Sequence, residues 1–385
     1  QNWMFLGSYE KLREDLTKRH RISRLLQIGY NSFPELNSKV VQAAAFIIEK
    51  HSSQRSGIFV NANDAPQSAN KESVFKERLA SRSFYFSTAD DFARIPGSPI
   101  AYWLSDAAVQ AFSHKDRALS DHAELREGLT SGDNDKFLRA WHEVGFNSSS
   151  SSGSNCFEEG KAWTQHRKGG EYRKWYGNND YFLFWKNDGS ALKNSPKSLL
   201  RAQNFYFREA LSWSRVTSGE FAIRYYPAGQ TFDSTSPSLF SDNLSLKCCA
   251  AFLNSLVVAN LLRAMSPTLD FRLTSLGRLP FLELGDKEEI ATRLGDSCIA
   301  LSKSDWDAYE TSWDFTTLPL LSPDHRAGTL EATYASLRAH WQGMTDEMQA
   351  LEEENNRIFI DAYGLQDKLP PEVPIEEITL TCNPA

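Results

Sequence analysis

The sequence predicts an α/β protein made of three successive regions: the closing half of a Rossmann-like sheet, an irregular α/β domain and a helical C-terminal region. Three observations lead to this prediction. Strand-like apolar runs alternate with helical periodicity up to about residue 83, and short aromatic runs between Gly, Asn and Pro signals continue to about residue 282. Helical periodicity then dominates the remainder. We therefore expect domains at 1–83, 84–282 and 283–385.

The first region has the pattern of the second half of a doubly wound domain. Ser8 is expected to open a helix with a basic end at Lys18-Arg19, and residues 22–28 and 57–60 are expected to be strands. The apolar, β-branched run 40–48 is expected to be a buried strand of a mixed sheet. The first half of such a domain carries a Gly-rich cofactor loop, which the sequence lacks. We therefore expect a cut through a larger protein and no cofactor in this chain.

The last region is predicted to contain long helices. Apolar residues from Tyr334 to Ile358 recur in steps of three and four, and Asn355 occupies a core position of this heptad-like seam. Two interpretations remain open: a helical hairpin within the chain, or a docking helix for another subunit.

Composition and missing motifs exclude several classes of protein. No apolar stretch approaches the roughly 20 residues that span a bilayer, so we expect no membrane partner. The five cysteines are scattered without C-x-x-C or Cys/His spacing, which favours a reducing cytoplasm and buried packing for Cys248-Cys249. H-E-x-x-H, G-x-x-x-x-G-K-[ST], G-x-S-x-G and G-x-G-x-x-G are all absent. The chain is therefore expected to have no catalytic or metal site of its own.

Charge is segregated along the chain, although the net charge is −7. Residues 161–224 hold twelve Lys or Arg against five Asp or Glu, with thirteen aromatic residues interleaved. Residues 346–377 hold ten acids against two bases. Basic side chains neutralise phosphates, while rings and amides contact sugars and base edges. We therefore expect double-stranded DNA to bind the middle region and the acidic tail to be dispensable for binding.

The loop 168–179 is the main candidate for DNA contact, with charged residues such as Lys174 on phosphates and amides such as Asn178 on bases. The alternative is that the rings are core and the bases a solvated face, which we favour for Phe182, Phe184 and Trp185. The segment 128–139 has two interpretations as well, a phosphate-holding turn or a structural turn capped by Asp133. The candidate DNA-binding residues are Lys136, Arg139, Arg167, Lys168, Tyr172, Arg173, Lys174, Trp175, Tyr176, Asn178, Asn179, Arg208 and Arg224.

Several long motifs resemble one family over nearly the whole chain. They include WMFL with YEKLR near the start, GLTSGDNDKFLR at 128–139, KGGEYRKWYGN at 168–178 and LEEENNRIFIDAYGL at 351–365. Two further motifs lie at 40–46 and 306–315. Together they resemble the C-terminal half of PglX-type adenine-specific DNA methyltransferases of BREX phage-defence systems.

This resemblance implies a closing methyltransferase sheet, a target-recognition domain and helical spacers like those of restriction-modification specificity subunits. It places the S-adenosylmethionine loop and the Asn-Pro-Pro-Tyr motif upstream, so the cofactor is expected in the full-length protein and this chain alone is expected to be inactive. Phe33 falls where the family keeps a ring that stacks on the flipped base.

Other BREX proteins or a phage inhibitor are further candidate partners. The rival function is a scaffold that docks other defence subunits; a free-standing nuclease would need a carboxylate cluster that the sequence lacks.

Overall fold

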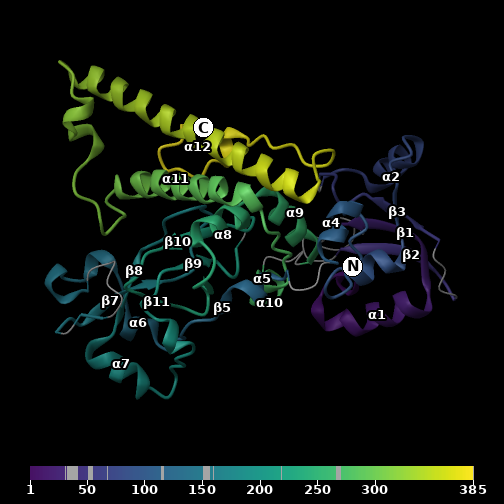
Figure 1. The fold of residues 1–385 in the computed structure, drawn as a ribbon, viewed down its shortest axis with the longest axis horizontal. Helices are drawn as coiled ribbons and strands as arrows, with labels where there is room; N and C mark the ends of the chain where they lie inside the picture. The colour runs from purple at the N-terminus through teal and green to yellow at the C-terminus, as the bar shows by residue number, and fades with distance from the viewer. Residues whose placement is uncertain are drawn as a thin grey trace. The chain divides into compact units, whose positions relative to one another are not determined.

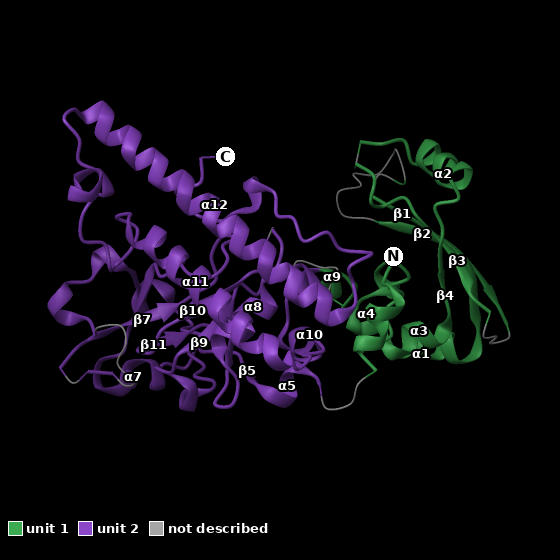
Figure 2. Cartoon of the chain, turned by 45° about the horizontal axis from the view of Figure 1, so that its top comes forward, with its two compact units in different colours: residues 1–115, 260–267 green, residues 116–259, 268–385 purple. Residues whose placement is uncertain are grey.

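The computed structural model describes residues 1–30, 32, 42–50, 55–66, 68–113, 117–150, 157–158, 160–217, 219–265 and 270–384 (Figure 1). Phe33 and residues 40–41 lie outside these ranges. The chain forms two compact units (Figure 2). Unit 1 comprises residues 1–115 and 260–267, and unit 2 comprises residues 116–259 and 268–385.

Unit 1 is built on a mixed four-stranded sheet in the order β2-β1-β3-β4. Strand β1 pairs antiparallel with β2 and parallel with β3, and β4 is antiparallel to β3. Its elements are α1 (Glu10–Arg19), β1 (Arg21–Gly29), β2 (Ala43–Glu49), β3 (Gly57–Asn61), α2 (Lys71–Ala80), β4 (Tyr85–Ser87), α3 (Ala89–Arg94) and α4 (Asp106–Ala111). The predicted helix and the strands at 22–28 and 57–60 are confirmed. Ser8 does not open the helix, because α1 begins after Tyr9 and has no side-chain cap.

A small aromatic core holds unit 1 together. Phe59 of β3 stacks on Tyr102 with ring centroids 5.0 Å apart, and Phe92 of α3 meets its edge. The buried Arg13 guanidinium of α1 donates hydrogen bonds to the carbonyl oxygens of Gly97, Ser98, Trp3 and Leu6. A buried cation is thus satisfied by carbonyls, and it fixes α1 against the loop after α3.

Strand β2 departs from the prediction that the run 40–48 is buried. Phe46, Ile47 and Ile48 are exposed by 44, 54 and 36%. The reason is its place at the edge of the sheet, where β1 is the one strand among the described residues that pairs with it. The apolar sequence marks a strand correctly but does not say what covers it.

Unit 2 contains two four-stranded sheets, β10-β9-β12-β5 and β11-β7-β8-β6. Most pairs are antiparallel, and β7 is parallel to β11. A core of Leu, Phe, Trp and Tyr side chains includes Trp185, Phe232 and Phe240. The strands are β5 (Glu124–Arg126), β6 (Leu138–Ala140), β7 (Trp163–Arg167), β8 (Tyr181–Phe184), β9 (Ala210–Trp213), β10 (Ile223–Tyr226), β11 (Gln230–Phe232) and β12 (Ser238–Phe240).

The helices of unit 2 include two long ones, α11 and α12, which lie beside one another in both views (Figures 1 and 2). Helix α12 buries Leu337, Met344, Met348 and Ile358, and Asn355 donates to the carbonyl oxygen of Ala251 in α8. The helical seam is thus used within the chain. The helices are α5 (Leu119–His122), α6 (Asn134–Phe137), α7 (Lys186–Lys193), α8 (Leu246–Leu253), α9 (Leu256–Met265, divided between the units), α10 (Leu273–Gly277), α11 (Glu288–Asp307) and α12 (Leu330–Tyr363).

Two other expectations concern α8. Cys248 and Cys249 are free and buried in this helix, so the packing interpretation of the pair is confirmed. Among the described residues, no single helix has the length and apolarity to cross a membrane. The bent pair α8 and α9, with 66° between its members, meets those two criteria only when taken together.

The units have different bounds from the three regions expected from the sequence. Residues 84–115 join the first unit, and the helical region 283–385 belongs to the same unit as the two sheets. The physical reason for the second difference is a set of buried polar contacts between the loop 168–179 and the helices.

Candidate nucleic-acid interface

The loop 168–179 packs into unit 2 through its charged residues. Arg173 is 7% exposed, and its guanidinium forms an ion pair with Asp305 of α11 at 2.7 Å. It also donates to the carbonyl oxygen of Tyr176 and lies over the ring of Trp306, 5.0 Å from the centroid. This side chain is fully engaged inside the protein.

Lys174 makes a second buried ion pair. Its ammonium lies 2.7 Å from Glu352 of α12, and the two side chains are 11 and 3% exposed. The indole N–H of Trp175 donates to the other oxygen of the same carboxylate at 2.7 Å. Burial alone would lower the pKa of Lys174, but Glu352 raises it above its ordinary value. The lysine therefore stays charged as the counter-ion of a buried carboxylate.

The remaining buried candidates also make their contacts inside unit 2. Arg224 is 1% exposed and donates to the carbonyl oxygen of Arg173, while Asn178 donates to that of Glu171. Arg167 is fully buried over the ring of Tyr226, and burial lowers its pKa to about 10. Tyr176 is also buried. The prediction that these side chains meet DNA is corrected because they face the protein interior; the residues concerned are Arg167, Arg173, Lys174, Trp175, Tyr176, Asn178 and Arg224.

The other candidates are accessible. Lys136 is exposed, and Arg139, Lys168, Tyr172, Asn179 and Arg208 are partly exposed. Asp133 caps α6 by accepting from the amide of Lys136 at 3.1 Å, as the structural interpretation of this turn expects. Phe182 and Trp185 are buried in and after β8, as predicted.

An exposed loop at 193–208, here called the basic loop, combines the residue types that DNA recognition needs. No Asp or Glu occurs between Gly189 and Arg208. Its exposed side chains include three cations and three amides, and Arg208 at its end is partly exposed. The exposed cations and amides are Lys193, Asn194, Lys197, Arg201, Gln203 and Asn204. Cations of this kind neutralise phosphates, and paired amide donors and acceptors distinguish base edges.

The basic loop is fixed to the segment 128–139. Thr130 and Leu199 exchange backbone hydrogen bonds of 2.8 and 2.9 Å, and the Ser198 hydroxyl donates to the carbonyl oxygen of Ser131. Gly132, with φ of +71°, lies so close to Lys197 that a Cβ would stand 2.3 Å from its carbonyl oxygen. Only glycine fits this contact. The basic loop and the segment 128–139 thus present one continuous surface.

The backbone of the basic loop is strained at two non-glycine residues. Ala202 and Phe207 adopt φ values of 52° and 66°, which cost on the order of 1 kcal/mol each. The Tyr206 hydroxyl, which donates to the carbonyl oxygen of Arg201 at 2.7 Å, holds this shape. Such strain concentrates at functional loops. The acid-free run is the sequence signal for this loop, and it lies inside the longer segment 161–224, which holds five acids.

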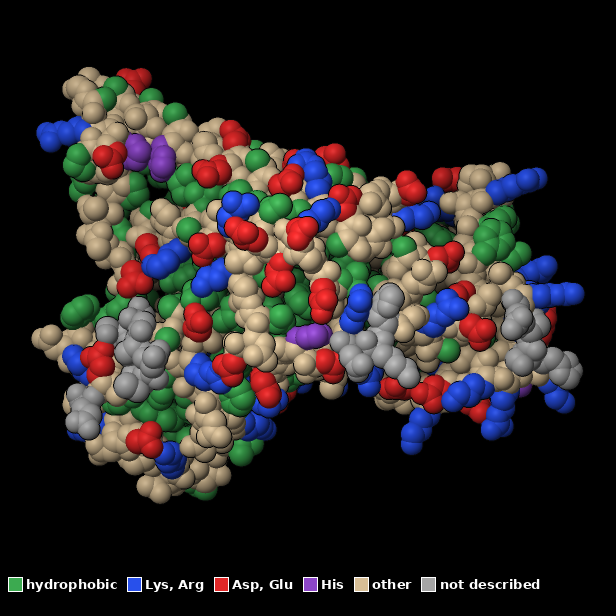
Figure 3. Space-filling view, viewed as in Figure 1, with side chains coloured by type: hydrophobic (Ala, Val, Ile, Leu, Met, Phe, Trp, Pro, Cys, Tyr) green, Lys and Arg blue, Asp and Glu red, His purple; other side chains and the backbone are tan. Residues whose placement is uncertain are grey.

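The helical side of unit 2 has the opposite charge character. On the face in Figure 3, acidic side chains are scattered over α11 and α12. Asp346, Glu347, Glu354 and Asp361 of α12 are exposed. Carboxylates at these positions repel phosphate, so this face is a poor one for DNA.

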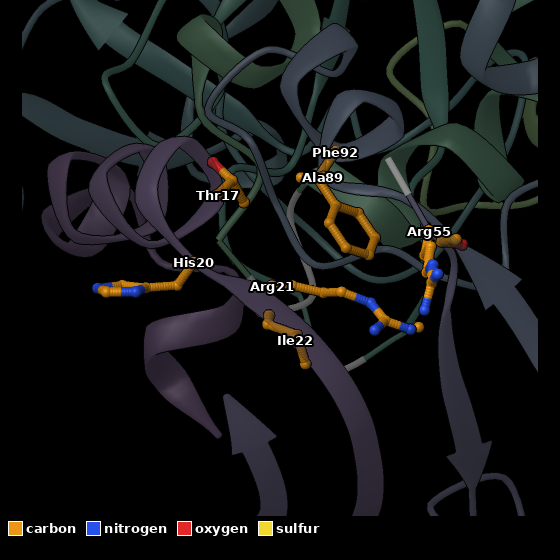
Figure 4. A pocket seen from close by; sticks show the side chains of 9 residues that line it. Thr17, His20, Arg21, Ile22, Arg55, Ala89 and Phe92 are labelled. Carbon is orange, nitrogen blue, oxygen red and sulfur yellow. The ribbon is translucent and has the colours of Figure 1, made fainter. Parts of the chain in front are cut away.

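A depression beside α1 and β1 in unit 1 is too small for S-adenosylmethionine. Its volume is about 10 Å³, far below the range of about 300–1,000 Å³ that is usual for ligand pockets (Figure 4). Its lining includes Arg21, which is held by Glu49 and by the carbonyl oxygen of Ser56, and it has no carboxylate for ribose hydroxyls. The residues that line this depression therefore do not fit the cofactor.

Comparison with known proteins gives two relatives that match nearly the whole chain. The adenine-specific methyltransferase PglX of Lacticaseibacillus casei (strain Zhang) is 36% identical over 394 residues, which cover 98% of this chain and 32% of the relative. The adenine-specific methyltransferase BrxX of Escherichia coli O9:H4 (strain HS) is 32% identical over 388 residues, covering 100% of this chain and 30% of the relative. No protein-family model matches the chain.

Two solved structures are similar in outline. The Type IIL restriction-modification enzyme MmeI in complex with DNA aligns with a TM-score of 0.48 and 11% identity, over 94% of this chain and 46% of that one. The type IIG restriction endonuclease BpuSI aligns with a TM-score of 0.34 and 12% identity over the same shares.

By sequence, the chain is therefore related to adenine-specific methyltransferases. Within that class it matches the C-terminal part of PglX and BrxX over nearly its whole length, as the motifs predicted. It spans about a third of the length of these relatives.

Proposed function

We propose that this chain is the DNA-recognition part of an adenine-N6 DNA methyltransferase that acts in phage defence. S-adenosylmethionine and the catalytic motifs belong to the remaining two thirds of the longer protein. Duplex DNA lies against unit 2 at the basic loop and the adjoining segment 128–139. In this proposal Lys136, Lys197 and Arg201 hold the backbone, and Gln203 and Asn204 read bases.

The observation that carries the proposal is the basic loop itself. It is exposed, free of acids and rigidly attached through Thr130 and Leu199, and it carries exposed amides beside its cations. A surface with cations alone would bind DNA without reading it. The relatives methylate adenine according to their names, and a site-specific enzyme needs a part that recognises sequence.

The experiment is duplex-DNA binding by the chain at several salt concentrations. Lys197→Ala and Arg201→Ala should weaken binding to all sequences and lower the salt slope by about one unit each, as expected for one lost phosphate contact. Asn204→Ala should relax sequence preference, with about 1 to 3 kcal/mol of discrimination lost at one base pair. The matched control is Lys76→Ala, because Lys76 is exposed and paired with Glu72 in unit 1. Absence of salt-dependent binding by the unaltered chain would refute the proposal.

The second candidate function is docking of other phage-defence subunits. The observation that favours it is a group of exposed apolar residues around the start of α12: Leu318, Leu321, Leu330 and Tyr334. Apolar side chains that gather on a surface mark interaction sites. Leu330→Glu should then abolish association with a purified subunit of the same defence system and leave DNA binding unchanged.

A further inference from the structure

Two arginines beside the end of the basic loop share one aromatic ring. The guanidinium of Arg126 lies 5.0 Å from the ring centroid of Phe205, and that of Arg208 lies 5.4 Å from the same centroid. Arg208 also lies over Phe240, a buried ring that packs on Phe205. The rings orient both cations without neutralising them.

Each of these arginines is paired with an exposed carboxylate. Arg208 lies 2.5 Å from Asp242, with side chains 37 and 81% exposed. Arg126 pairs with Glu124, with side chains 42 and 55% exposed, and also donates to the carbonyl oxygen of Leu125. Exposed ion pairs of this kind contribute little to stability, so they can separate at small cost.

A solvent-open cavity of about 210 Å³ lies at this place, and Glu124, Arg208, Phe240 and Asp242 all line it. A partner can therefore reach both the guanidinium of Arg208 and the two carboxylates. Planar guanidinium groups bind phosphate through two parallel hydrogen bonds, which a backbone phosphate offers as well as a carboxylate does.

We infer that Arg126 and Arg208 form a clamp for the DNA backbone, and that Glu124 and Asp242 are its internal competitors. In the free protein the two carboxylates pair with the guanidinium groups. When DNA binds, its phosphates replace the carboxylates as partners. Their charge then remains near the phosphates and weakens attachment to DNA of any sequence. The pairs thus set the overall affinity for the DNA backbone and leave the sequence preference unchanged. This inference rests on the proposed function and specifies its regulation.

The test compares duplex-DNA affinity of the full chain with that of Asp242→Asn and Glu124→Gln. Each variant should bind about two- to fivefold tighter, the size of effect expected for an exposed ion pair, and with a steeper salt slope. The gain should disappear when Arg208→Ala is combined with Asp242→Asn. The control is Asp361→Asn, whose carboxylate is also exposed and paired, with Lys287.

Three outcomes overturn the inference. Wild-type affinity of both carboxylate variants would do so while leaving the proposed function standing, because the unaltered chain still binds DNA. A gain that persists without the Arg208 side chain would show an effect of net charge alone. Tighter binding of inorganic phosphate by both carboxylate variants, without tighter binding of duplex DNA, would assign the clamp to free phosphate instead.

Discussion

At the scale of single residues, the charged side chains that resembled a DNA-binding set in the sequence turn out to be of two kinds. Arg173 and Lys174 hold the loop 168–179 against α11 and α12, whereas Lys197 and Arg201 are solvent-exposed. A buried cation with a carboxylate partner and an exposed one contribute very differently to folding.

Lys174→Ala should therefore act on stability. It leaves the Glu352 carboxylate buried with only Trp175 as partner, and we expect the free energy of unfolding to fall by about 3 to 5 kcal/mol. Denaturant titration measures the loss. Lys287→Ala, at an exposed pair with Asp361, should cost less than about 1 kcal/mol. Equal effects of the two substitutions would contradict the assignment.

His166 should make unit 2 sensitive to acid. Burial lowers the pKa of this fully buried imidazole, although Asp233 partly offsets the effect. The unfolded chain then binds a proton that the folded chain refuses, so stability is present above the unfolded pKa of 6.5 and is lost as pH falls below it. Thermal melts from pH 8 to pH 5 should show this decline. His166→Gln should flatten it, and an unchanged slope in that variant would argue against the cause.

At the scale of elements, we expect the exposed edge strand β2 to have the largest effect on association with other strands. An apolar edge strand with open backbone groups associates with other strands. In the longer relatives, we expect a strand from the remaining part of the protein to cover it.

Ile47→Glu should reduce self-association of the isolated chain, because a charge on an edge strand blocks pairing. Ile47 lies opposite the exposed Arg24 of β1, so the new carboxylate gains a cross-strand partner and unfolding should change by less than about 0.5 kcal/mol. Sedimentation velocity measures the association. Leu12→Glu, at an exposed position of α1, is the control. If the Ile47→Glu variant still associates as strongly as the unaltered chain, β2 is not the strand through which the chain associates.

At the scale of the whole molecule, the acidic tail is part of the core of unit 2. Glu352, Asn355, Tyr363 and Cys382 are buried, and the backbone amides of Thr381 and Cys382 donate to Asp305. The expectation that residues 346–385 are dispensable for DNA binding treats them only as surface charge. The buried residues among them also stabilise the fold of unit 2.

Deleting residues 346–385 should abolish the cooperative unfolding transition of unit 2, since it removes the partner of Lys174 and half of α12. Neutralising only the exposed carboxylates Asp346, Glu347, Glu354 and Asp361 to amides should leave the melting temperature within a few degrees. Calorimetric melts of both proteins separate the two roles. A deletion protein that still melts cooperatively at the original temperature would contradict this account of the tail.

The sequence by itself determined the relatives, the α/β character and three of the four strands of unit 1, β1, β2 and β3, because long motifs and hydrophobic periodicity are local properties of the chain. It also separated a basic middle region from an acidic end. Only the tertiary structure decided which basic side chains are buried and that β2 is an exposed edge strand. Arg173 and Asp305 are distant in the sequence, and no local pattern shows that such a cation has a buried partner. Burial and pairing depend on contacts between distant segments, whereas periodicity reports only what each segment can do alone.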